Sequence, residues 1–226
     1  MKNKELERRS YSFEIRADKN EENVGVLTGR PIVYNSRTNL GWFDEIIEAG
    51  ALDKTDLRDV RFLVNHDTSK IPLARSRNNN ENSTMQLMVD NEGMAIRVNL
   101  DVENNTEARN LYSAVQRGDI TGMSFMFGVD SEEWADLETE HPTRTIKEIS
   151  TVIEVSAVTF PAYESTSITA RNKEALDNAR AALDSAKKSL DSENNKRALE
   201  LEKAKLELKF RKWGLLKWTK NYWKRC

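Results

Sequence analysis

Short apolar runs, broken by polar turn residues, fill most of the chain between residues 10 and 171. Runs of this length that are rich in β-branched residues are typical of β-strands. The pattern predicts strands over residues 10–17, 24–34, 59–64, 84–89, 94–102, 122–129 and 145–160. Asp90-Asn91-Glu92-Gly93 is a turn sequence between two of them, so we expect a hairpin there. Because strands and helices do not alternate in βαβ order, the pattern favours a barrel or a curved sheet.

Two segments carry a helical pattern. Residues 105–116 predict a helix within the strand-rich region, capped by Thr106 and ended by Gly118. Residues 172–209 contain no glycine or proline and have helical composition. Apolar residues recur there three or four positions apart: Leu176, Ala179, Leu183, Ala186, Leu190, Leu201, Ala204 and Leu208. A polar break at 192–196 leaves two interpretations, one long interrupted helix or a helical hairpin. The apolar residues fit packing either on the chain's own domain or on a second copy of the chain.

The length of 226 residues fits one large domain, or one ordinary domain with an extension. We divide the chain into an N-terminal arm (1–9), a domain of α+β class with a mainly β core (10–171), a charged helical connector (172–209) and a basic aromatic tail (210–226). The net charge of −2 conceals a contrast, because residues 196–226 hold eleven Lys and Arg but three Asp and Glu. Such a basic end suggests either a partner of its own or a solvated helix end.

Composition also excludes several classes of protein. No run approaches the ~20 apolar residues of a transmembrane helix, and the first nine residues lack the apolar stretch of a secretory signal. The single cysteine, Cys226, excludes a disulfide framework and favours a reducing intracellular setting. With one cysteine and two histidines, no structural zinc site is expected, and no phosphate-binding or dinucleotide-binding motif is present. We therefore expect no cofactor and no metal.

Polar side chains in otherwise apolar strands are the strongest chemical signal. His66 follows the run 60–64, Ser124 lies within 122–127, and Glu154 and Ser156 lie within 152–158. A carboxylate in an apolar run needs a hydrogen-bonding or charged partner, because burying it alone is costly. Serine, histidine and an acid are the parts of a nucleophilic hydrolase, in which histidine takes the serine proton and the acid orients the imidazole.

Each of these residues also has a simpler interpretation. His66 can be a turn residue after a strand, and Ser124 can be a small residue that lets sheets pack closely. Glu154 can be a solvent-facing carboxylate at a strand edge. The only other histidine, His141, precedes Pro142 in a polar loop, so a histidine-dependent enzyme would use His66 as its base. The residues alone leave both interpretations open.

An ordered set of segments resembles the prohead protease family of tailed bacteriophages over roughly residues 8–171. The matching segments are Gly29-Arg30-Pro31-Ile32-Val33-Tyr34-Asn35, Phe43-Asp44-Glu45-Ile46-Ile47, Asp59-Val60-Arg61-Phe62-Leu63-Val64-Asn65-His66-Asp67, Pro72-Leu73-Ala74-Arg75, Arg117-Gly118-Asp119-Ile120-Thr121-Gly122-Met123-Ser124-Phe125 and Glu154-Val155-Ser156-Ala157-Val158-Thr159-Phe160-Pro161-Ala162-Tyr163. These serine endopeptidases process capsid or scaffold proteins and resemble the herpesvirus assemblins. The resemblance implies an assemblin-like barrel of mostly antiparallel strands ringed by helices, followed by a C-terminal helical extension.

The resemblance also implies roles for matched positions. His66 matches the catalytic histidine and Ser124 the nucleophile, while Glu154 is our choice for the third member and Asp67 its rival. Assemblins use arginine in the oxyanion hole, which makes Arg75 and Arg77 candidates beside their simpler interpretation as surface charges.

Substrates and location follow from the resemblance as expectations. The major capsid protein, the scaffold protein and this chain itself are the expected substrates, inside the assembling prohead in the host cytoplasm. Homo-oligomerisation and docking of the C-terminal tail on capsid or scaffold are expected, without a membrane or nucleic acid. The alternative is a non-catalytic assembly or scaffold-binding module that keeps a protease-like fold.

Overall fold

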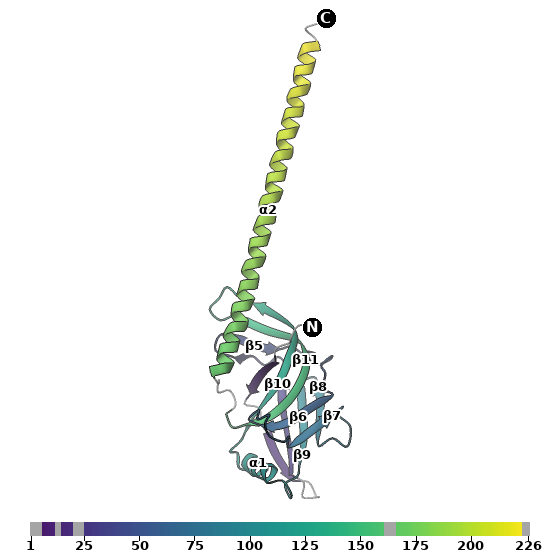
Figure 1. Cartoon of the computed structure of the whole chain (residues 1–226), viewed down its shortest axis with the longest axis vertical. Helices are drawn as coiled ribbons and strands as arrows, with labels where there is room; N and C mark the ends of the chain where they lie inside the picture. Colours follow the sequence, from purple (N-terminus) through teal and green to yellow (C-terminus); the bar gives the residue numbers. More distant parts are fainter. Residues whose placement is uncertain (1–5, 12–14, 20–24, 161–165, 223–226) are drawn as a thin grey trace. The chain divides into compact units, whose positions relative to one another are not determined.

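The computed structural model describes residues 6–11, 15–19, 25–160 and 166–222. The chain forms two compact units, Met1–Leu176 and Asp177–Cys226. The described elements are β1 (Leu6–Tyr11), β2 (Ile15–Lys19), β3 (Gly25–Val33), β4 (Thr38–Asn39), β5 (Asp44–Ile47), β6 (Asp59–Val64), β7 (Ala74–Arg77), β8 (Met85–Asp90), β9 (Gly93–Leu100), α1 (Thr106–Arg117), β10 (Gly122–Ala135), β11 (Thr143–Val158) and α2 (Thr166–Tyr222) (Figure 1).

The larger sheet is built around β10 and β11, which run antiparallel over most of their length. Along one path its order is β1-β10-β11-β5-β4, and β1 is antiparallel to β10. The edge of β11 opposite β10 holds two parallel strands, β5 beside residues 143–146 and β6 beside residues 154–157. Strand β7 then pairs antiparallel with β6. This arrangement places β6 directly beside the end of β11 that carries Glu154 and Ser156.

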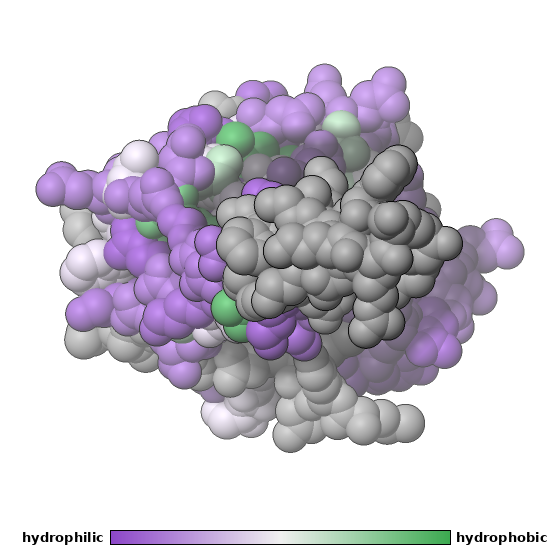
Figure 2. All heavy atoms as spheres, turned by 90° about the horizontal axis from the view of Figure 1, so that it is seen from above, coloured by the Kyte–Doolittle hydropathy of each residue, from purple (hydrophilic) through white to green (hydrophobic). Residues whose placement is uncertain are grey.

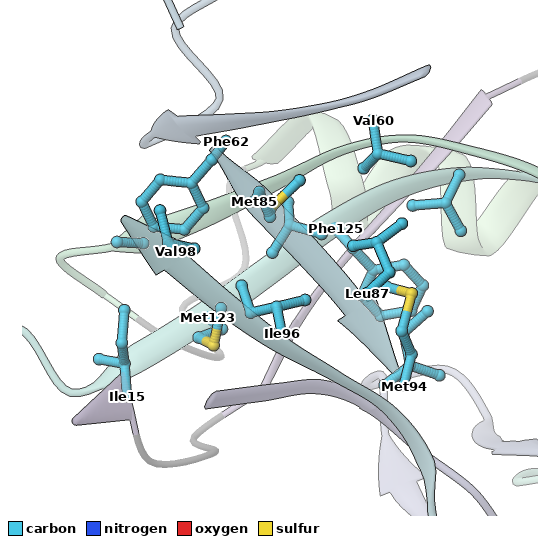
Figure 3. Packing of buried hydrophobic residues seen from close by; sticks show 14 of the residues in the cluster. Ile15, Val60, Phe62, Met85, Leu87, Met94, Ile96, Val98, Met123 and Phe125 are labelled. Carbon is cyan, nitrogen blue, oxygen red and sulfur yellow. The ribbon is translucent and has the colours of Figure 1, made fainter. Parts of the chain in front are cut away.

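The smaller sheet has the order β2-β3-β9-β8, with every neighbouring pair antiparallel. Apolar side chains from both sheets and α1 form one continuous core, whose centre is seen in Figure 3. Phe62 and Phe125 come from the larger sheet, while Met94, Ile96 and Val98 come from β9, and none is more than 1% exposed. One face of β6 and β10 is therefore committed to the core, which leaves the other face for the polar residues.

The expected α+β class with a mainly β core is confirmed, but the expected barrel is not. Among the described strands, β4 and β7 each pair on one side only, so the larger sheet stays open. The smaller sheet likewise ends at β2 and β8. Side-chain packing between two open sheets, rather than closure of one sheet, buries the apolar face of each.

The structure confirms some of the local predictions from the sequence and contradicts others. The expected hairpin is confirmed, with Asp90 paired to Gly93 across the turn. Gly118 ends α1 in the left-handed region at φ 79°. The N-cap is Asn105 and not Thr106, because the Asn105 side chain accepts hydrogen bonds from the next backbone N–H groups. The single strand expected over 10–17 is wrong, because β1 ends at Tyr11 and β2 pairs in the other sheet.

A buried cluster of charged side chains fixes β1 to the larger sheet. Arg9 is 4% exposed and forms hydrogen bonds with Glu45 on β5 and Glu7 on its own strand. Arg144 on β11 is 2% exposed and binds Glu7, Glu45 and Glu132. Burying guanidinium groups is costly unless carboxylates surround them, and here they do. The cluster therefore joins β1, β5, β10 and β11 through side chains as well as through the backbone.

The second unit consists of helix, since α2 continues from the first unit through the polar break to Tyr222. Residues 192–196 contain no glycine or proline, which explains why the break does not end the helix. Leu176 packs with Leu40 and Phe43 in the first unit, whereas Leu190 and Leu208 are about 60% exposed.

None of the helices in the described ranges combines the length and apolarity needed to cross a bilayer. Hydrophilic residues cover most of the coloured surface in Figure 2, with small hydrophobic areas between them.

Candidate active site

Four polar residues come together on the face of the larger sheet that points away from the core. The register pairs Ser124 on β10 with Ser156 on β11, and Met126 with Glu154. On the other edge of β11, β6 runs parallel and leads directly to His66. Paired residues of neighbouring strands project from the same face, so Ser124, Ser156 and Glu154 share one face with the turn that carries His66.

His66 and Glu154 are in direct contact. The His66 Nδ1 atom forms a short hydrogen bond with Glu154 Oε1, and Glu154 is 1% exposed. A carboxylate that only accepts hydrogen bonds pairs with Nδ1 in the tautomer that carries its proton there, which leaves Nε2 as the nitrogen for proton transfer. His66 Nε2 is buried and has no hydrogen-bond partner among the described residues. The imidazole is therefore oriented by the acid and keeps its basic nitrogen available.

Ser156 forms hydrogen bonds with both members of this pair. Its hydroxyl donates to Glu154 Oε2 at 2.6 Å and accepts from the backbone N–H of His66 at 3.1 Å. Both carboxylate oxygens of Glu154 are thus engaged, which fixes the plane of the carboxylate. Ser156 is completely buried. Its position fits a residue that holds the acid and the histidine backbone in register.

Ser124 is completely buried beside this group. Its hydroxyl donates a hydrogen bond of 2.7 Å to the backbone carbonyl oxygen of Arg9 on β1. The structure brings Ser124 to the strand next to Glu154 and Ser156, but among the described residues His66 Nε2 accepts no hydrogen bond from Ser124. A proton transfer from Ser124 to His66 therefore needs the hydroxyl to turn away from Arg9.

The turn that presents His66 is strained and clamped. Asn65 and His66 have φ angles of 52° and 58°, in the left-handed region that non-glycine residues seldom adopt. The Asn65 side chain accepts from the Thr159 N–H at 2.9 Å and donates to the Thr159 hydroxyl at 3.0 Å. The Asn65 N–H also donates to the Ala157 carbonyl. These bonds attach the turn to the end of β11, the strand that carries Glu154.

We expect Asn65→Ala to destabilise the protein by about 2 kcal/mol, because alanine loses both bonds to Thr159 and is disfavoured at positive φ. Asn65→Gly loses the same bonds but tolerates the backbone, so about 1 kcal/mol is expected. Urea unfolding of the two variants measures the difference. Equal losses would show that the left-handed backbone at Asn65 contributes nothing measurable.

The remaining candidates have other partners. The Asp67 carboxylate, the rival acid, accepts hydrogen bonds from the Ser69 N–H and hydroxyl. The Ser69 hydroxyl and N–H lower the pKa of Asp67, which keeps it ionised on the loop. His141 contacts Asp44, and Arg75 holds Asp59 through two hydrogen bonds. Within the described ranges, no group of three or more His, Cys, Asp and Glu side chains is arranged to hold a metal.

A groove of about 440 Å³ lies against the turn that carries His66. Its walls come from the segment 63–73 and from α1, including Leu63, Leu73 and Leu111. Ile71 beside it is 85% exposed, an unusual state for a large apolar side chain.

Two features of the site escaped the sequence-based interpretation. The clamp between Asn65 and Thr159 was missed, although asparagine directly before the histidine is the residue type that best tolerates a left-handed backbone. The contact of Ser124 with Arg9 was also missed, because nothing in the pattern of residues 6–11 indicates which strand they join.

Comparison with known proteins completes the description. The family model for the caudovirus prohead serine protease matches residues 2–180. The prohead protease of Enterobacteria phage HK97 is 29% identical over 149 residues, which is 65% of this chain and 60% of that protein. The bacteriophage T4 capsid assembly protease covers 70% of this chain and 99% of its own, with 12% identity and a TM-score of 0.40. With four fifths of its length matched by the family model, the chain belongs to the caudovirus prohead serine protease family.

Proposed function

We propose that the chain is a serine endopeptidase in which Ser124 is the nucleophile, His66 the general base and Glu154 the residue that orients the base. The observation that carries the proposal is the buried His66–Glu154 contact, which leaves Nε2 without a partner among the described residues. An imidazole held this way by an acid, near a buried serine, is the arrangement that serine hydrolases use. Family membership supports the same class of reaction.

The chemistry then proceeds in two halves. Ser124 Oγ attacks the substrate carbonyl carbon while its proton moves to His66 Nε2, and the imidazolium that forms is stabilised by Glu154. The C–N bond breaks, the proton passes from His66 to the leaving amine, and an acyl-enzyme remains on Ser124. A water molecule attacks this ester, gives a proton to His66, and the carboxylate product leaves as the proton returns to Ser124.

Before the first step, the Ser124 hydroxyl has to exchange its acceptor from the Arg9 carbonyl to His66 Nε2. Rotation about one side-chain bond on β10 is the smallest change that could do this. Glu154 needs no such change, because Ser156 and His66 already hold both of its oxygens. Arg75 and Arg77, the candidates for contact with the oxyanion, both lie on β7, which β6 separates from Glu154 on β11, and Arg75 also holds Asp59.

Capsid and scaffold proteins of the same phage are the proposed substrates, in the assembling prohead within the host cell. The HK97 relative is named a prohead protease, and the T4 protein a capsid assembly protease. Residues 10–171 are the proposed protease domain, 172–209 a connector and 210–226 a tail that docks on capsid or scaffold. Action on this chain itself and homo-oligomerisation belong to the same proposal.

A fluorophosphonate probe tests the assignment without knowledge of the cleavage site. The probe phosphonylates a serine only when a base activates its hydroxyl, and peptide mass spectrometry then locates the adduct. We expect the adduct on Ser124 in the natural protein and much slower labelling in His66→Ala. An adduct on another serine, or equal labelling of Ser124 without His66, would contradict the triad and favour the non-catalytic assembly module.

A further inference from the structure

A second groove, of about 710 Å³, lies over β6 and β7, and four of its nine lining residues are arginine. Its walls hold Arg58, Arg61, Arg75 and Arg77 against two acids, Asp56 and Asp59. Strands β6 and β7 lie side by side in Figure 1, and the register pairs Arg61 with Arg75 and Asp59 with Arg77. Three guanidinium groups on two short strands, with a fourth directly before β6, contrast with the excess of acidic over basic residues in residues 1–195.

The charges in this groove are only partly balanced. Asp56 binds Arg58, and Asp59 is shared by Arg61 and Arg75. Arg77 makes no side-chain hydrogen bond or ion pair with any described residue, and it is exposed. Two positive charges therefore remain without a counter-charge in a concave surface, where a carboxylate would find several fork-shaped donors.

The groove lies on the same face as the candidate active site. Arg61 is paired with Glu154, the acid that holds His66, and the opposite face of β6 is buried through Val60 and Phe62. Glu154 also contacts the His66 ring, so only the spacing of neighbouring strands, about 5 Å, separates the backbone of Arg61 from that of the acid in the candidate site. A peptide chain whose scissile bond lies at His66 would therefore reach the groove with residues a few positions away.

We propose that this arginine groove is a specificity site for the protease, which binds acidic side chains of the substrate polypeptide at some distance from the bond that is cleaved. The inference rests on the proposed function for the identity of the substrate, but the groove itself is independent of the triad. Guanidinium groups recognise the acidic side chains by bidentate pairing with their carboxylates. The net positive charge of the groove, four arginines against two aspartates, attracts them. Arg77 is the residue with the most to contribute, because its guanidinium acts on Asp59 only through its charge and forms no hydrogen bond or ion pair with a described residue.

Binding can be measured on the full chain carrying Ser124→Ala, so that no peptide is cleaved. The probe is a short fluorescein-labelled peptide of alternating glutamate and glycine, followed by anisotropy. We expect Arg77→Glu to weaken binding about tenfold, Arg77→Lys to weaken it less, and added salt to weaken binding in the unaltered groove. Arg97→Glu is the matched control, since Arg97 is also an exposed strand arginine but lies on β9.

The proposal would be wrong if the glutamate peptide did not bind, or if Arg77→Glu and Arg97→Glu weakened its binding equally. It would also be wrong if oligothymidine bound more tightly than the glutamate peptide and Arg77→Glu abolished that binding. The last would make the groove a nucleic-acid site. Because the binding assay needs no catalysis, its failure leaves the serine labelling result intact, and a failed labelling experiment leaves the groove testable.

Discussion

Replacing Ser124 by alanine is expected to reduce cleavage of the co-expressed major capsid protein by about a thousandfold or more, whereas Ser156→Ala should leave measurable activity. The two serines face each other across β10 and β11, so this pair of variants separates the nucleophile from its neighbour. Without Ser124 no acyl-enzyme forms. Without Ser156 the Glu154 carboxylate loses one donor, but its contact with His66 remains.

A time course of capsid protein cleavage, followed on denaturing gels, checks this expectation. Unchanged thermal unfolding of both variants is the control, since each removes one oxygen from a buried site. Should Ser156→Ala stop cleavage while Ser124→Ala proceeds normally, the roles of the two serines would have to be exchanged. Normal cleavage by both would remove this face of the sheet from the mechanism.

Removing the charge of Arg144 is expected to produce the largest loss of stability. Arg144→Met should lower the free energy of unfolding by about 3–5 kcal/mol, because truncating one partner leaves buried carboxylates without their counter-charge. Glu45 is 1% exposed and would keep only Arg9, while Glu132 would lose its two bonds from Arg144. Urea unfolding measures the change.

Arg97→Met is the matched control for that measurement, because exposed Arg97 has no comparable cluster and its loss should change stability by less than about 0.5 kcal/mol. Arg144→Lys keeps the charge but loses the fork geometry, so an intermediate loss is expected. A loss below about 1 kcal/mol in Arg144→Met would show that the cluster stabilises little beyond the cost of burying it.

Acid should weaken the same cluster. Burial alone raises the pKa of Glu7, but the hydrogen bond from Arg144 and the charges of Arg9 and Arg144 outweigh burial and lower the pKa from 4.5 to about 2. A carboxyl with a lowered pKa contributes its full stabilisation above pH 4.5, and that contribution is lost as the pH falls towards about 2. Between pH 4.5 and about 2, the free energy of unfolding should therefore fall by less in Arg144→Met than in the natural protein.

Part of the fold could be predicted from the hydrophobic pattern because it is local. Strand β6 has the expected bounds, and the hairpin of β8 and β9 follows from its turn sequence. The missed strands β4, β5 and β7 have two to four residues and mostly polar sequences. Such short strands depend on the neighbours that they pair with, and no periodicity within them is long enough to be detected.

The contact between His66 and Glu154 could be anticipated for a different reason. A buried glutamate in an apolar run demands a partner, and His66 is the partner that the fold supplies to Glu154. Register and the pairing of distant strands could not be read from the pattern, so the Arg9 carbonyl beside Ser124 was not expected. Arg9 lies in the segment expected to be an N-terminal arm, and its buried partner Glu45 comes from β5, 36 positions away in the chain.

The pairing of β11 with both β5 and β6 has a consequence for folding kinetics. His66 and Glu154 lie 88 positions apart in the chain, and Ser124 and Arg9 lie 115 positions apart. Contacts of such long range form late, because the entropy of closing a large loop must be overcome first. While residues 154–158 are still inside the ribosome, Glu154 is not in place to orient the His66 ring. The topology therefore delays the assembly of the proposed active site until nearly the whole β domain has been synthesised and folded.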